Sequence, residues 1–153
     1  MTDRYYHTSH RALRIGNTLT VGVYGERLDS DTEAFEYAVY IREKLFEQYR
    51  QAHHPELPSR FDCVFLYPSE VSARAYHGVV EQYRSHLYEV ELVSGTPFIA
   101  DMTWLHCAGQ PYEHILANAA RYWSGEHLPD SVTLEAICSG EVRVRALVRE
   151  GVG

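Results

Sequence analysis

The sequence predicts a single α+β domain in which short strands alternate irregularly with three helices. Its 153 residues and hydrophobic content of 45% are sufficient for one core. The apolar patterns run in the order strands, helix, strand, helix, strand, helix and two closing strands, without a repeat or a long linker. So many short strands favour one α+β domain over residues 1–153 rather than a doubly wound parallel sheet.

The first part of the chain is predicted to hold two short extended segments and a long helix. Residues 4–7 (RYYH) are typical of a strand, and residues 18–23 of a second extended segment after a turn. Apolar residues at helical spacing over 35–49 predict the helix. Ser30 and Glu33 precede it at capping-box spacing, so we expect its N-terminus there.

The stretch over residues 59–93 is predicted to form a strand, a turn, a helix and a second strand. Residues 63–67 are a short apolar and aromatic run, which is typical of a strand buried on both faces. Ser69 can cap the following helix. Over residues 88–92, apolar and acidic residues alternate, as in a half-exposed strand. The apolar helix residues expected to face the sheet are Val71, Ala75, Val79 and Tyr83. Tyr67 therefore lies at the end of a buried strand, where rings often line clefts.

The last part of the chain is predicted to add one strand, one helix and a pair of strands. Residues 98–100 are typical of a short strand, and the pattern over 111–125 indicates a helix that begins at a proline and ends at a glycine. Residues 132–137 and 142–148 are two further strands. They are joined across residues 139–140 (Ser-Gly), which is typical of a tight hairpin turn.

Composition and charge exclude several classes of protein. The formal net charge of −7 gives no general attraction to nucleic acid or to an anionic membrane. The N-terminus is polar and no apolar run approaches membrane-spanning length, so we expect a cytoplasmic protein with no membrane partner. Three widely separated cysteines without a CxxC pair favour reduced thiols over a disulfide framework: Cys63, Cys107 and Cys138.

The chain carries no strong catalytic or metal-binding motif. It lacks a P-loop, a GxGxxG turn and an HExxH pair. Its nine histidines show no standard ligand spacing, so no metal site is predicted. Cys63 lies in an apolar strand, where a buried thiol is expected rather than a nucleophile. Ser69 is expected to be a helix cap rather than a catalytic serine, because no GxSxG elbow surrounds it.

Three polar residues stand at the ends of apolar strands: His7, Tyr67 and Glu135. The segments around them are YYHTS at residues 5–9 with ALRIG at 12–16, VFLYPS at 64–69 and LEAI at 134–137. In this order they resemble the three motifs of small bacterial ADP-ribosyltransferases, a family that includes rifampin ADP-ribosyltransferases. The order is that of the His-Tyr-Glu branch, with its diphtheria-toxin-like and poly(ADP-ribose)-polymerase-like members. The resemblance spans nearly the whole chain, and the order and spacing of the motifs carry it.

The resemblance implies a split mixed β-sheet with flanking helices around a cleft for NAD. It also implies an enzyme that transfers ADP-ribose from NAD and releases nicotinamide. As catalytic residues, Glu135 would stabilise the oxocarbenium character of the ribose, His7 would bond a ribose hydroxyl and Tyr67 would stack on the nicotinamide. Arg60 would meet a phosphate. Further cofactor contacts are implied for Thr8, Ser69 and Tyr76.

Each of these residues also has a structural explanation when it is considered alone. His7 can be a strand-end histidine with a local hydrogen bond, and Tyr67 can be a core residue. Glu135 can be an exposed strand residue, and Arg60 a solvated charge. Together and in family order, they favour a nucleotide-binding cleft.

The chain departs from the family pattern in its polar positions. Thr8 stands where glycine usually follows the histidine, which leaves less backbone freedom near the cofactor. Thr133 stands where arginine-modifying members carry a second acid, which disfavours arginine as the acceptor. In some small members the acid comes from an earlier loop, so Asp101, ahead of Trp104, is an alternative acid.

Three functions follow from these patterns. The first is NAD-dependent ADP-ribose transfer or NAD hydrolysis, and the second is binding of a nucleotide or NAD derivative without turnover. The third is a structural or partner-binding module whose twelve tyrosines lie in the core and in interfaces. The sequence identifies no acceptor (protein, nucleic acid, small molecule or water) and does not distinguish a toxin from a resistance enzyme or a phage factor. If the cleft forms, His7, Tyr67 and Glu135 should converge in one pocket. A glutamate on the opposite sheet face from Tyr67 would exclude the enzyme, and so would three side chains that are scattered or packed into the interior without an opening to water.

Overall fold

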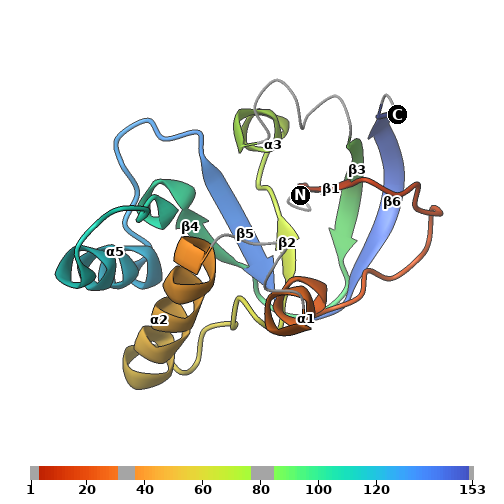
Figure 1. The fold of residues 1–153 in the computed structure, drawn as a ribbon. Coiled ribbons are helices and arrows are strands. Elements are labelled where there is room, and N and C mark those ends of the chain that lie inside the picture. The colour runs from red at the N-terminus through yellow and green to blue at the C-terminus, as the bar shows by residue number, and fades with distance from the viewer. Residues whose placement is uncertain (1–3, 31–36, 77–84, 152–153) are drawn as a thin grey trace.

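The computed structural model describes residues 4–30, 37–76 and 85–151. In this part of the chain, the strands form two three-stranded antiparallel sheets (Figure 1). The first sheet has the order β1-β3-β6, and the second has the order β2-β5-β4. The strands are β1 (Tyr5–Ser9), β2 (Val64–Leu66), β3 (His86–Leu92), β4 (Phe98–Asp101), β5 (Leu134–Cys138) and β6 (Val142–Arg149). The predicted α+β class is confirmed, but every pairing between the described strands is antiparallel, so the expected mixed sheet is not found among them.

Among the described residues, one backbone bridge links the two sheets, between Tyr6 and Tyr67. The amide of Tyr6 donates to the carbonyl of Tyr67 at 2.9 Å, and the amide of Tyr67 donates to the carbonyl of Tyr6 at 2.8 Å. The strand order therefore continues as β4-β5-β2-β1-β3-β6 through one bridge instead of a full ladder. Because two strands held by one bridge can diverge away from it, the sheet is split between β1 and β2, which run in different directions in Figure 1.

Helices cover the second sheet and one end of the split. They are α1 (Val23–Ser30), α2 (Tyr37–His53), α3 (Glu70–Tyr76), the 3-10 helix η2 (Met102–Leu105) and α5 (Tyr112–Ser124). In Figure 1, α2 and α5 lie side by side next to the second sheet, whereas α1 lies at the lower end of β2. The indole nitrogen of Trp123 joins α5 to α2, because it donates to the carbonyl of Phe46 at 2.9 Å. No described helix combines the length and the apolar character needed to cross a bilayer.

The second sheet is buried on both faces, as the apolar run in its first strand predicts. On the side of the helices, Cys63 and Ile137 belong to the same core cluster as Phe46. On the other side, Leu66 belongs to a cluster that includes Val144 of the first sheet. Alternation along the strands separates these two sets of side chains. The predicted buried thiol is confirmed, since Cys63 is 2% exposed.

The strands predicted over residues 132–137 and 142–148 form, but the predicted hairpin between them is wrong. β5 pairs with β2 and β4, and β6 pairs with β3, so the two strands belong to different sheets. The turn at Gly140 packs against Ser94 so closely that an added Cβ would lie 2.1 Å from the Ser94 carbonyl oxygen. Turn residues therefore indicated where the chain bends, whereas packing between the sheets selected the strand partners.

The region before α2 departs from the predicted pattern. Residues 18–23 pair with β6 through one isolated bridge, and the chain then enters α1, which the apolar pattern did not predict. The Ser30 hydroxyl donates to the Glu26 carbonyl at 2.7 Å, so Ser30 lies at the end of α1 and not at the start of α2. Glu33, the other half of the expected capping box, lies within residues 31–36, outside the described residues.

Ser69 caps α3 as predicted, since the amide of Ser72 donates to its hydroxyl oxygen at 3.1 Å. The predicted buried face of this helix is wrong at its two described residues, Val71 and Ala75, which are both exposed. Val71 is 59% exposed, whereas Ser72 and Ala73 are buried. The other predicted contacts within 77–84 lie outside the described residues. Tertiary packing, and not apolar character alone, therefore selected the inward face.

Candidate functional site

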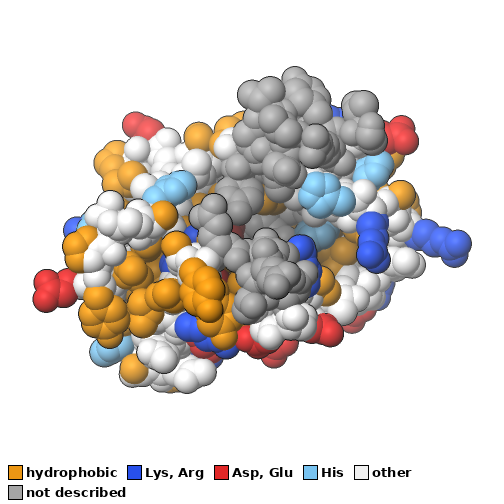
Figure 2. Space-filling view, in the orientation of Figure 1, with side chains coloured by type: hydrophobic (Ala, Val, Ile, Leu, Met, Phe, Trp, Pro, Cys, Tyr) orange, Lys and Arg blue, Asp and Glu red, His pale blue; other side chains and the backbone are white. Residues whose placement is uncertain are grey.

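A cleft of about 540 Å³ lies between β1, β2 and α1, at the split between the two sheets. His7 and Thr8 line it from β1, Phe65 from β2, and Val23 and Tyr24 from α1. Its volume falls within the roughly 300–1,000 Å³ typical of small-molecule sites. In the space-filling view of Figure 2, histidine side chains gather over the region of β1. We take this cleft as the candidate site, because it combines polar residues of β1 with aromatic rings.

His7 lines the cleft with a ring whose protonation follows from its contacts. Its Nδ1 atom lies 2.9 Å from the carbonyl oxygen of Phe65, which can only accept a hydrogen bond, so Nδ1 carries the proton. Burial lowers the pKa of His7, and the bond to the Phe65 carbonyl offsets only part of this effect, so the ring is neutral at neutral pH. In this neutral form Nε2 is an acceptor. His7 can therefore accept a hydrogen bond from a ligand hydroxyl.

Tyr24 and Phe65 form an aromatic wall of the cleft. Their ring centroids lie 5.1 Å apart in an edge-to-face arrangement. The Tyr24 hydroxyl donates to a carboxylate oxygen of Glu43 at 3.0 Å. Burial, followed by the negative charge of Glu43, raises the pKa of Tyr24, so its phenol stays protonated. Sequence reasoning missed Tyr24 because it missed α1, and no motif marks this tyrosine separately.

A buried network of charges lies behind this wall. The Arg60 guanidinium stands over the Phe65 ring, 5.0 Å from the ring centroid. Arg60 donates to the two carboxylate oxygens of Glu43 at 2.8 and 3.0 Å, and to a carboxylate oxygen of Glu135. Arg60, Glu43 and Glu135 are 5%, 1% and 5% exposed. Because an unpaired buried carboxylate is costly, this arginine permits both acids to lie in the interior.

The network keeps Glu43 and Arg60 ionised. Burial alone would raise the pKa of Glu43, but the charge of Arg60 and the hydrogen bonds from Arg60 and Arg42 outweigh burial and hold it at about 2. Burial would lower the pKa of Arg60, but Glu135 and Glu43 hold it well above its ordinary value. The Tyr122 hydroxyl accepts from Arg60 at 2.7 Å and donates to Glu135 at 2.6 Å. Arg60, expected to be a phosphate contact or a solvated charge, is therefore placed in the interior and bound to carboxylates.

Glu135 and Tyr67 are buried and are not among the residues that line the cleft. The antiparallel register pairs Leu66 with Ala136, so the next positions, Tyr67 and Glu135, fall opposite each other and on the same sheet face. Of the two arrangements that would exclude the enzyme, a glutamate on the opposite sheet face is thus not observed. However, His7 lines the cleft whereas the other two lie in the interior. The expected convergence of all three in one pocket is therefore not found in the part of the chain that the structure describes.

The remaining predicted contact residues have different positions. Thr8 lines the cleft. Ser69 caps α3 and is not among the cleft residues. Tyr76 is the last residue of α3, and its side chain lies outside the described part of the structure. Among the described residues, no group of three or more His, Cys, Asp or Glu side chains is placed to hold a metal ion.

Asp101, the alternative acid, is fully buried and caps η2. Its carboxylate accepts hydrogen bonds from the amides of Thr103 and Leu128, both at 2.9 Å. Burial would raise the pKa of Asp101, but these hydrogen bonds outweigh it and lower the pKa. The nearby Trp104 donates its indole N–H to the Glu126 carbonyl at 2.7 Å. Asp101 therefore joins η2 to the loop after α5 and does not line the cleft.

The fold and the cleft together define an α+β protein with a split antiparallel sheet and a candidate small-molecule site at the split. The chain belongs to the family described as a protein of unknown function, DUF2441, whose model matches residues 3–150. A comparison with the curated proteins finds no match. All residues that line the cleft fall within the part of the chain that the family covers.

Proposed function

We propose that this chain binds NAD, or another nucleotide that contains ADP-ribose, in the cleft between β1 and β2. The observation that carries the proposal is the neutral ring of His7, which the Phe65 carbonyl holds at the split so that its second nitrogen is an acceptor. A ribose offers hydroxyl donors to such a nitrogen. The resemblance of the strand ends to ADP-ribosyltransferases supports the same ligand, since it assigns ribose recognition to this histidine.

The rest of the lining suits the other parts of such a nucleotide. The wall of Tyr24 and Phe65 offers aromatic surface to a base or a nicotinamide ring. Thr8 adds a hydroxyl from β1. Leu13 and Leu19 add apolar surface. An apolar site with a few polar groups is typical of small-molecule binding.

ADP-ribose transfer from NAD is the second candidate function, and the sheet face that Glu135 shares with Tyr67 is the observation that favours it. Glu135 lies in β5, where the antiparallel register places it opposite Tyr67. In that reaction the bond between nicotinamide and ribose breaks, and nicotinamide leaves with the bonding electrons. The nucleophile of an acceptor, or water, forms the new bond to the ribose and loses a proton. A carboxylate beside the sugar would stabilise the cationic transition state.

The ion pair between Glu135 and Arg60 separates the two candidates. The carboxylate of Glu135 accepts hydrogen bonds from Arg60 and Tyr122 and does not line the cleft. Its charge is therefore already compensated by a buried guanidinium. Transfer requires this carboxylate to leave Arg60 for the ribose, whereas binding requires no such change. For this reason we rank binding above transfer.

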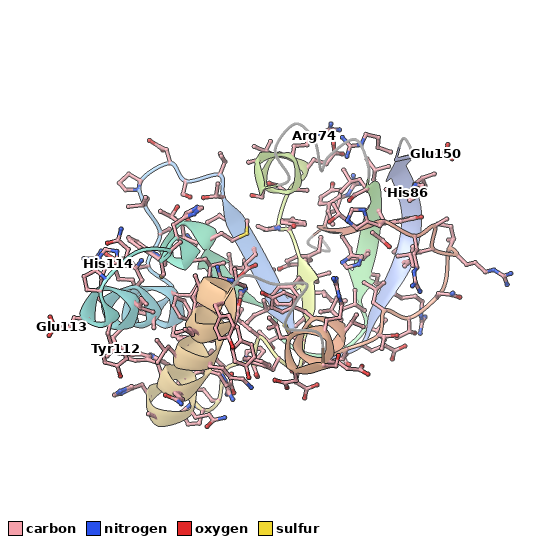
Figure 3. All side chains as sticks on the ribbon, in the orientation of Figure 1. Arg74, His86, Tyr112, Glu113, His114 and Glu150 are labelled. Carbon is pink, nitrogen blue, oxygen red and sulfur yellow. The ribbon has the colours of Figure 1, made fainter. Side chains whose placement is uncertain are left out.

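Ligand binding tests the proposal directly. Calorimetric titration and thermal unfolding with NAD and with ADP-ribose should show binding and a raised Tm. His7→Ala should weaken binding roughly fivefold, because a hydrogen bond of about 1 kcal/mol is lost. His114→Ala is the matched control, since His114 is exposed on the outer side of α5 (Figure 3) and does not line the cleft. No binding of either nucleotide would contradict the proposal.

Release of nicotinamide separates binding from transfer. If the chain is an enzyme, incubation with NAD should release nicotinamide, and Glu135→Gln should abolish the release while NAD still binds. Binding without release would support the first candidate and exclude the second. If release is seen, labelled NAD incubated with a cell lysate would show which fraction receives the ADP-ribose.

A further inference from the structure

Both rings of the aromatic wall are contacted from behind by the buried network. The Tyr24 hydroxyl donates to the Oε1 atom of Glu43 at 3.0 Å, and the Arg60 guanidinium stands 5.0 Å from the centroid of the Phe65 ring. Tyr24 and Phe65 line the cleft, whereas Glu43 and Arg60 do not. The two residues behind the wall therefore contact the rings that a ligand would meet, without lining the cleft themselves.

Glu43 offers its carboxylate to the wall in a fixed position. Its buried oxygens accept hydrogen bonds from Arg60 at 2.8 and 3.0 Å and from Arg42 at 2.7 Å. Arg42 also donates to the Leu105 carbonyl at 3.1 Å, and Arg60 also donates to Glu135. A carboxylate among donors that are themselves bound cannot turn without breaking several buried hydrogen bonds at once. The acceptor that faces the wall is therefore held rigidly.

The backbone that carries the Tyr24 ring is held as well. Gly25 follows Tyr24 in α1, and an added Cβ on Gly25 would lie 2.2 Å from the carbonyl oxygen of Phe61. This close approach fixes α1 against the segment before β2. The ring of Tyr24 is thus held at its backbone by packing and at its hydroxyl by a hydrogen bond. A ring held at both ends cannot swing into or out of the cleft.

A side chain that is ordered before its ligand arrives loses less conformational freedom on binding. We propose that Glu43 is a positioning residue of the nucleotide cleft, because it accepts the hydrogen bond that holds the Tyr24 ring where a ligand meets it. α2 contributes no residue to the lining, so it takes part in binding through a contact behind the wall. This inference rests on the proposed function and adds a residue that acts on the same site from the interior.

Tyr24→Phe tests the hydrogen bond, since it removes the hydroxyl and keeps the ring. Calorimetric titration of the full chain with ADP-ribose should show binding about fivefold weaker than in the unsubstituted chain, because the ligand must then order the ring. Tyr112→Phe is the control. Tyr112 is exposed on α5 (Figure 3) and does not line the cleft, so its loss of a hydroxyl should leave the Kd unchanged.

Glu43→Gln tests the acceptor. A neutral amide oxygen is a weaker acceptor than a carboxylate, so ADP-ribose should bind about threefold more weakly. In the double variant with Tyr24→Phe, Glu43→Gln should weaken binding no further, because the hydrogen bond is already lost. If the two substitutions instead weaken binding independently, Glu43 acts through a general loss of stability and the positioning role is wrong.

Glu47→Gln is the matched control for this substitution. Glu47 lies one turn after Glu43 on α2, and its carboxylate accepts hydrogen bonds from Arg50 at 2.6 Å and from Ser59 at 2.8 Å. It does not line the cleft. Glu47→Gln should lower the free energy of unfolding and leave the Kd for ADP-ribose unchanged. Weaker binding in this variant would show that any ion pair of α2 affects the cleft, which would contradict the inference.

Failure of the inference and failure of the proposed function are distinguishable. If ADP-ribose binds equally to the unsubstituted chain and to Tyr24→Phe, the positioning role of Glu43 is wrong while nucleotide binding in the cleft stands. If neither ADP-ribose nor NAD binds to the unsubstituted chain, the proposed function fails and the inference fails with it.

Discussion

The cleft and the buried ion network lie on opposite sides of the same aromatic wall, Tyr24 and Phe65, and they use polar side chains in opposite ways. On the cleft side, His7 bonds the protein through one ring nitrogen and keeps the other as an acceptor. Behind the wall, Arg60 binds two carboxylates, and the Glu135 carboxylate receives hydrogen bonds from two side chains. A polar residue at a strand end is therefore available to a ligand only where neighbouring elements leave part of it without a partner.

The helices create this difference. α2 brings Glu43 to Arg60, and α5 brings Tyr122 to the same guanidinium. In the interior, these interactions are strengthened by the low dielectric, and a broken network is correspondingly costly. α1, in contrast, contributes Arg27 at the exposed side of the cleft. The network is thus expected to govern stability, and to affect binding only through the wall that it holds.

Removal of Arg60 should have the largest effect on stability. Arg60→Leu leaves Glu135 in the interior without a cation and leaves Glu43 with Arg42 alone, which should cost about 3–5 kcal/mol of unfolding free energy. Urea unfolding measures this loss. Arg74→Leu is the control, since Arg74 forms an exposed ion pair with Glu70 and should change stability by at most about 1 kcal/mol. Equal losses in the two variants would show that the network does not hold the interior together.

Acid should weaken the network through Glu43. The pKa of Glu43 is about 2 in the folded chain against an ordinary value of 4.5, so the unfolded chain binds this proton more tightly. The contribution of the ionised Glu43 carboxylate to the free energy of unfolding is complete above about pH 4.5 and is lost as the pH falls towards 2. At about 1.4 kcal/mol per pKa unit, it is on the order of 3 kcal/mol.

Urea unfolding over this acidic range, compared with Glu43→Gln, isolates the effect. The variant should be less stable at neutral pH but should depend less on pH between about 4.5 and 2. An unchanged dependence on pH would show that Glu43 is not the group that titrates.

A close backbone contact positions the wall of the cleft, and it offers a test of intermediate size. An added Cβ on Gly25 of α1 would lie 2.2 Å from the carbonyl oxygen of Phe61. Alanine normally stabilises a helix by about 1 kcal/mol relative to glycine, so a net loss of stability in Gly25→Ala would be due to the contact with Phe61. We expect a net loss of about 1–2 kcal/mol in unfolding free energy, together with weaker nucleotide binding. Glu26→Ala, an exposed position of the same helix, should change neither.

The smallest effect on stability is expected at His7. His7→Phe removes the hydrogen bond to the Phe65 carbonyl and should cost about 1 kcal/mol. Because burial lowers the pKa of His7 in the folded chain, protonation favours unfolding. The contribution of the neutral His7 ring to the free energy of unfolding is complete above the ordinary pKa of 6.5 and decreases as the pH falls below that value. Urea unfolding at neutral and mildly acidic pH measures both effects, and a loss that did not depend on pH would contradict the neutral ring.

Elements that depend on nearby residues were predictable from the sequence. The helix over 111–125 forms as α5, and Gly125 ends it with φ at 78°, a conformation that glycine adopts without strain. The cap at Ser69 was predictable because its partner, Ser72, is three residues away. The strand predicted at the N-terminus forms as β1 for the same reason, since its pattern is local.

The candidate site was predictable only in part. His7 and Thr8 were identified from strand-end motifs, and both line the cleft. Tyr24 was not identified from the sequence, because α1 has a weak apolar pattern and packs through a glycine. Glu43 was not identified either, because a glutamate in an amphipathic helix is usually solvated. Only its contact with Arg60 shows that it belongs to the interior.

By itself, the sequence determined the α+β class, the main helices and the positions of Tyr67 and Glu135 beside the ends of β2 and β5, because these follow from spacing within short segments. His7, expected at a strand end, lies in the middle of β1, because pairing with β3 extends that strand to Ser9. The tertiary structure alone decided which of those residues faces the cleft. Arg60 and Glu135 are 75 positions apart in the chain and meet only after β2 and β5 have paired. Burial and ion pairing depend on such distant partners, so local patterns can place a polar residue at a strand end but not determine which partner binds it.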